Sequence, residues 1–73
     1  MDRAMWEQHL ALTERHIAQA HRHIANQHQI VAELKRDGYD LTRAQELLAE
    51  CEATLKRHLE HRDRLKADLE TAN

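Results

Sequence analysis

Histidine is the residue type that most sets this sequence apart. The chain of 73 residues carries seven of them: His9, His16, His21, His23, His28, His58 and His61. Imidazole is the commonest metal ligand among side chains, and its ordinary titration falls between pH 5 and 8. The histidines therefore suggest two chemistries, metal binding and a response to pH.

Metal binding depends on how the histidines are spaced. Two ligands on one helix must lie three or four residues apart to emerge on the same face, and only His58 and His61 have that spacing. The helix register described below places His16 opposite this pair, so His16, His58 and His61 are the candidate ligands for zinc or nickel. The alternative, which we favour, is that His58 is a buried polar residue hydrogen-bonded to Thr13 or to a carbonyl.

A response to pH is the second possibility. Protonating all seven histidines would move the formal net charge from -2 to +5, one unit for each residue. A charged imidazole is costly where it is poorly solvated. His58 between the helices, or His21 and His28 beside an interface between chains, would therefore disfavour assembly at low pH. Metal binding and pH response together form the alternative to the function predicted below.

Nothing in the sequence indicates the machinery of an enzyme. There is one cysteine, no serine and no glycine-rich loop. Cys51 and His58 lie seven residues apart, which is about 10 Å along a helix and beyond hydrogen-bonding reach. We interpret Cys51 as a small side chain facing Ile24 between the helices, and we predict a protein without catalytic activity or a cofactor.

A basic segment raises the question of nucleic-acid binding. Residues 56–66 carry five cations against two acids. We expect most of these charges to form pairs, Glu52 with Lys56, Glu60 with Arg64 and Asp63 with Lys66. Arg62 falls in the seam, near Glu14. No aromatic residues interleave with the cations to stack on bases, and the sequence pI is about 6.4. A solvated helix face is therefore favoured over nucleic-acid binding.

Two long helices must position these residues. The only break in the helical pattern lies at 37–40, where Gly38 can adopt the left-handed conformation that follows a helix C-terminus. Asp40, with Thr42 as a competitor, is the predicted N-cap of the next helix. The sequence predicts one domain over 1–73, with a helix at 3–36, a turn at 37–40 and a helix at 41–71. So short a connection makes the helices antiparallel neighbours, giving an all-α, coiled-coil-like αα-hairpin.

Heptad spacing identifies the faces along which the helices pack. The first helix has one row of Leu10, Ile17, Ile24 and Val31, and another of Trp6, Thr13, Ala20, Gln27 and Leu34. The second has one row of Leu41, Leu48, Leu55, Arg62 and Leu69, and another of Ala44, Cys51, His58, Leu65 and Ala72. Spacings of three and four sustained this long indicate a coiled-coil-like seam. Folding at Gly38 then places Ile17 opposite His58 and Gln27 opposite Leu48.

A row of small residues predicts a second packing surface. At seven-residue spacing outside the seam lie Ala4, Ala11, Ala18, Ala25 and Ala32. Two helices bury little core, and domains of this size usually gain stability from a partner, a metal or disulfides. We predict that this alanine row, with His21 and His28 beside it, is the interface of a homodimer that forms a four-helix bundle. The alternative is that alanine, the best helix former, simply fills surface positions.

Composition excludes several other classes of protein. The chain has no proline, one glycine and two aromatic residues, which argues against a β-sandwich or barrel. A single cysteine excludes a disulfide scaffold. No window is apolar enough for a transmembrane helix, and the first residues lack the apolar run of a secretory signal. We therefore expect a cytoplasmic protein.

Several segments resemble those of a known group of proteins. They are Arg15-His16-Ile17-Ala18, Asp37-Gly38-Tyr39-Asp40, Ala44-Gln45-Glu46-Leu47-Leu48 and His61-Arg62-Asp63-Arg64-Leu65. Through them the chain resembles a group of short, uncharacterised bacterial helical-hairpin proteins with no established activity. The resemblance implies a helical hairpin and a bacterial cytoplasm, and it carries no catalytic residue across. We predict a non-enzymatic protein–protein interaction module, a small scaffold, adaptor or regulator, that self-associates through its first helix and binds an unknown protein partner.

Overall fold

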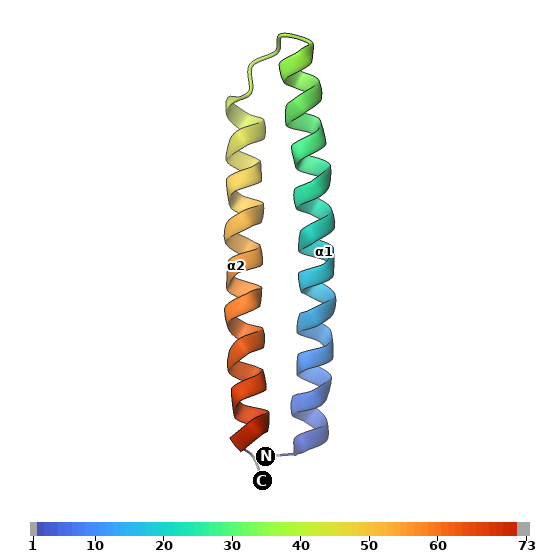
Figure 1. The fold of residues 1–73 in the computed structure, drawn as a ribbon, viewed down its shortest axis with the longest axis vertical. Coiled ribbons are helices and arrows are strands. Elements are labelled where there is room, and N and C mark those ends of the chain that lie inside the picture. Colours follow the sequence, from blue (N-terminus) through green and yellow to red (C-terminus); the bar gives the residue numbers. More distant parts are fainter. Residues whose placement is uncertain (1, 72–73) are drawn as a thin grey trace.

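The computed structural model describes residues 2–71 as two long antiparallel helices, α1 (Arg3–Arg36) and α2 (Thr42–Thr71). Figure 1 shows the helices side by side over their whole length, with the turn at one end and the start of α1 beside the end of α2 at the other. The Cα positions extend over 57 × 14 × 13 Å. This confirms the predicted helical hairpin, and α2 begins one residue after its predicted start.

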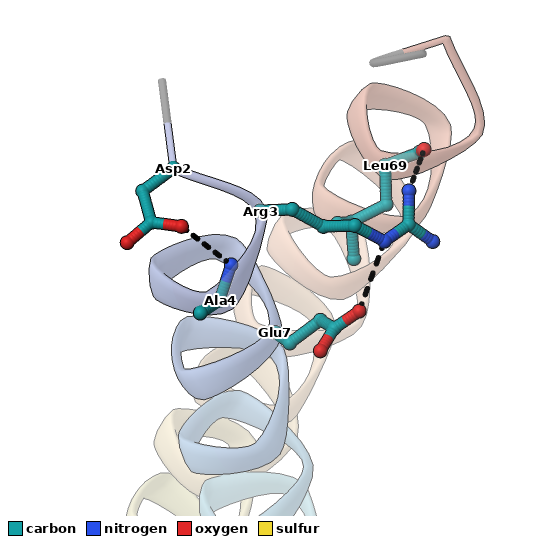
Figure 2. A network of polar contacts seen from close by, with 5 residues as sticks. All are labelled: Asp2, Arg3, Ala4, Glu7 and Leu69. Carbon is teal, nitrogen blue, oxygen red and sulfur yellow. Dashed lines mark hydrogen bonds and ion pairs between the residues drawn. The ribbon is translucent and has the colours of Figure 1, made fainter.

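A cap and a bridge hold the open end of the hairpin. The carboxylate of Asp2 accepts a hydrogen bond from the Ala4 N–H at 3.0 Å, which satisfies a free donor in the first turn of α1. Arg3 then joins the two helices, as Figure 2 shows. Its Nε donates to Glu7 at 3.0 Å, and its Nη1 donates to the carbonyl oxygen of Leu69 in α2 at 3.4 Å.

The turn forms around Gly38, as predicted. Gly38 has a φ of +79°, in the left-handed region where an L side chain is strained. The N–H groups of Gly38 and Tyr39 donate to the carbonyl oxygens of Lys35 and Leu34, at 3.3 and 2.9 Å. This is the Schellman arrangement, which satisfies the last carbonyls of a helix.

Asp40 caps α2, but it lies one residue further from the first helical residue than the predicted N-cap position. The Leu41 carbonyl accepts the first helical hydrogen bond, from the Gln45 N–H at 2.9 Å, so Leu41 occupies the N-cap position. Asp40 Oδ1 accepts from the N–H of Thr42 at 3.0 Å and from its hydroxyl at 2.8 Å. These two bonds, the backbone bond most strongly, lower the pKa of the Asp40 carboxyl from its usual 3.8. Thr42 is thus the donor in this cap and does not compete for it.

The core lies along the predicted seam. Every described residue of the four heptad rows is buried or half-buried, which confirms the two packing faces; Ala72 lies outside the described residues. The buried residues of the core are Thr13, Ile17, Ala20, Ala44, Leu65 and Leu69. Over residues 2–71, neither helix combines the length and the apolar character needed to cross a membrane.

Two polar residues are accommodated in the seam by hydrogen bonds. The hydroxyl of Thr13 donates to the His9 carbonyl of its own helix at 2.9 Å, so it bonds within α1 and not to His58. Gln27 Nε2 donates across the hairpin to the carbonyl oxygen of Ala44 at 2.9 Å. Ala44 lies one turn before Leu48, the residue that the predicted register places opposite Gln27.

Candidate functional site

His16 and His58 lie against each other across the hairpin. His58 occupies a seam position of α2 and His16 flanks the seam on α1, and both are half-buried. Their ring centroids are 5.4 Å apart and their planes are inclined by 51°. Two imidazoles on one tetrahedral zinc ion have ring centres about 5 Å apart, because each Zn–N bond is about 2.0–2.1 Å long. The spacing of this pair therefore suits a shared metal ion.

His61 does not complete a three-histidine group with this pair. It is exposed and lines a separate hollow with Met5, Trp6, His9 and Leu65. Within residues 2–71, no three histidine, cysteine, aspartate or glutamate side chains are grouped so that they could hold a metal ion. The single chain thus brings together two of the three predicted ligands and places the third in a hollow with His9.

Two further hollows lie between the His61 hollow and the turn. The middle one is lined by His16, Gln19, Ala20, His23, Thr54 and His58. The next is lined by Ala20, His23, Glu50, Cys51 and Thr54. Because the three hollows follow one flank of both helices, they are together called the histidine groove. It is defined by His9, His16, His23, Thr54, His58 and His61.

The side of α1 that borders the groove carries no charged residue over most of its length. Helical spacing of three and four residues places eight positions there, here called the uncharged flank: Met5, His9, Leu12, His16, Gln19, His23, Asn26 and Ile30. Met5, Leu12 and Ile30 are exposed at 50, 46 and 44%. They are three of the four large apolar side chains exposed among residues 2–71.

The sequence predictions missed this flank, although a signal for it exists. A third of the chain is charged, so a run of eight helix-flank positions without a formal charge is unusual. The run is visible in the sequence from Met5 to Ile30 once the seam has been located. On α2, Thr54 and His61 line the same hollows, and the Arg57 guanidinium donates to the Thr54 hydroxyl at 3.2 Å, so the α2 side of the groove does carry charge.

The alanine row lies on another side of α1. All five alanines are exposed, and so are His21 and His28. Charged residues border the row on both sides, with Glu7 and Glu14 toward the seam and Arg15 and Arg22 toward solvent. The predicted interface of Ala4, Ala11, Ala18, Ala25 and Ala32 concerns contacts between chains, so it stays a prediction.

The charges of the basic segment are arranged differently from the predicted pairs. Among residues 2–71 the ion pairs are Arg3–Glu7, Arg36–Asp37, Arg43–Glu46 and Arg62–Asp63. Arg62 Nη2 lies 3.0 Å from Asp63 Oδ1, so it pairs with the acid beside it in sequence. The predicted pairs of Lys56, Arg64 and Lys66 with acids on α2 are not formed.

Comparisons with known proteins find no relative by sequence or by structure. No protein-family model, curated protein or solved structure matches this chain. The resemblance to bacterial helical-hairpin proteins therefore stays a prediction. The functional interpretation rests on the seam, the histidine groove and the uncharged flank.

Proposed function

We propose that this chain is a non-enzymatic protein–protein interaction module that self-associates through α1. The observation that supports this is the surface that the hairpin leaves accessible. Its accessible area is 5604 Å², whereas a compact folded monomer of the same mass, 8.6 kDa, has about 4,700 Å². The excess of about 900 Å² is close to the roughly 800 Å² that each partner buries in a standard interface.

The thin core supports the same proposal. No side chain in residues 2–71 is completely shielded from solvent, and five apolar residues are classed as buried: Ile17, Ala20, Ala44, Leu65 and Leu69. Ordering each residue costs about 1.5 kcal/mol in conformational entropy. A hairpin with so little core gains stability from any partner that binds the folded state and not the unfolded one.

Native mass spectrometry of untagged protein, purified without chelator over a range of concentrations, tests the proposal. We expect a dimer or higher oligomer without bound metal near neutral pH. Circular dichroism on the same samples reports whether the chain is helical. A fully helical monomer at every concentration would contradict self-association.

The His16–His58 pair favours transition-metal binding as a second candidate function. Two imidazoles leave a tetrahedral site incomplete, and a second chain would supply the same pair again. Titration calorimetry with zinc or nickel should then give one ion for two chains. His58→Ala should abolish this binding, whereas the matched variant His61→Ala should retain it. Unchanged binding by His58→Ala would exclude the pair as the site.

A further inference from the structure

We infer that the uncharged flank of α1, together with the adjoining histidine groove, is the surface on which a second copy of this chain docks. The inference rests on the proposed self-association and names the side of α1 that is covered. It places the contact away from the alanine row.

This side of α1 differs from the others because it carries no formally charged residue. The cores of protein interfaces are depleted of charged residues. Between Met5 and Ile30, the charged residues of α1 are Glu7, Glu14, Arg15 and Arg22, and none of them lies on the uncharged flank. Across the groove, Arg57 Nη2 donates to the hydroxyl of Thr54 at 3.2 Å and brings a cation to this side of α2. Glu50 lines the end of the groove nearest the turn. The surface without formal charge is therefore the flank on α1.

The exposed apolar side chains point to the same side. Met5, Leu12 and Ile30 are each about half exposed, although full burial of such side chains is worth about 1.5–3 kcal/mol each. They are spread over about 38 Å of α1, at 1.5 Å per residue. An occupant must therefore lie lengthwise along the hairpin. Another hairpin, 57 Å long, has the required length.

The surface has both of the features that a self-complementary patch needs. A symmetric dimer places the same patch on both partners, so that patch must offer both projections and recesses. The flank supplies projecting side chains at Met5, Leu12 and Ile30, and the groove supplies three open hollows of about 220 to 260 Å³. One contact of standard size buries about 800 Å² on each partner, which is close to the excess accessible area of the hairpin.

Two neighbouring residues of α1 provide a matched test. Leu12 lies on the uncharged flank and Ala11 on the alanine row, and both are exposed, so Leu12→Glu and Ala11→Glu place the same charge on different sides of one helix. We expect Leu12→Glu to weaken the dimer at least tenfold in sedimentation equilibrium, and Ala11→Glu to leave it within about twofold. Loss of the dimer in Ala11→Glu but not in Leu12→Glu would overturn the inference and leave self-association intact. A monomeric wild-type protein would overturn both.

Cys51 offers a second readout that needs no substitution. It is a free, half-buried thiol that lines the groove beside Ala20 and His23. A second copy on the groove would cover it, so its reaction with N-ethylmaleimide should slow at least tenfold as protein concentration passes the dimer dissociation constant. The comparison is made with Ala11→Glu, which should show the same protection. A rate independent of concentration while the dimer forms would place the interface elsewhere.

Discussion

Gln27 joins the two helices through a hydrogen bond from its amide Nε2 to the backbone carbonyl oxygen of Ala44, at 2.9 Å. The bond lies in the seam, between Ile24 and Val31 on α1. Because a side-chain donor must meet one particular carbonyl, this contact favours a single alignment of the helices. Apolar contacts nearby tolerate small shifts much better.

The first prediction concerns Gln27. Gln27→Ala should lower the free energy of unfolding by about 1–2 kcal/mol, because both the hydrogen bond and the packing of the side-chain stem are lost. Gln27→Leu should remain within about 1 kcal/mol of wild type, since apolar packing against α2 replaces the bond. Urea unfolding followed by circular dichroism at one protein concentration measures both. Equal losses in the two variants would show that the seam is insensitive to packing here.

The second prediction concerns the turn. An added Cβ at Gly38 meets no atom within 4 Å, so any cost of substitution comes from the backbone at a φ of +79°. Gly38→Ala should destabilise the hairpin by about 1–2 kcal/mol. Gly38→Asn should cost less, because asparagine visits the left-handed region more readily. The urea midpoints of the two variants test this, and a reversed order would contradict it.

The third prediction concerns acid stability at the start of α2. The folded chain lowers the pKa of Asp40 from 3.8 through its two bonds to Thr42. A carboxyl whose pKa is lower in the folded state contributes stability above its unfolded pKa, and that contribution is lost as the pH falls through the folded value. Asp40→Asn should therefore be less stable than wild type at neutral pH, and the difference should shrink below about pH 3.8. A difference that is constant across this range would contradict the prediction.

The fourth prediction concerns a fixed charge in the groove, and it rests on the docking surface inferred above. A second copy would enclose His9, which lines a hollow with Met5, Trp6, His61 and Leu65. A buried, unpaired cation is costly, so His9→Lys should weaken the dimer at least tenfold in sedimentation equilibrium. His28→Lys places the same charge at an exposed position of α1 outside the groove and should leave the dimer within about twofold. Equal weakening by the two variants would contradict the docking surface.

Much of the fold is predictable from the sequence, because a seven-residue apolar repeat leaves few ways to bury two helices. The same repeat sets the register, and the contact between His16 and His58 follows from it. The exact cap of α2 is less predictable. The bonds from Thr42 to Asp40 span two residues, and whether Asp40 or Leu41 occupies the N-cap position depends on where the first helical hydrogen bond begins, which is set by the backbone and not by residue type.

The ion-pair partners of the charged side chains are not predictable from the sequence. Arg62 has Glu14 across the hairpin and Asp63 beside it, and exposed ion pairs differ by only about 0–1 kcal/mol. The choice between them depends on local geometry and not on residue type. The uncharged flank is different, because its pattern is present in the sequence. The alanine row is found in the sequence by one residue type at regular spacing. The uncharged flank contains several residue types, so it is found only by the absence of charged residues along it.

Because the hairpin is long and narrow, two ways in which two copies could pair give particles of different length. A copy laid lengthwise on the groove thickens the particle while its longest Cα dimension stays near 57 Å. If the turn at Gly38 instead opened into a continuous helix exchanged between two chains, the particle would become nearly twice as long. The maximum dimension from small-angle X-ray scattering therefore distinguishes a side-by-side pair from an exchanged one.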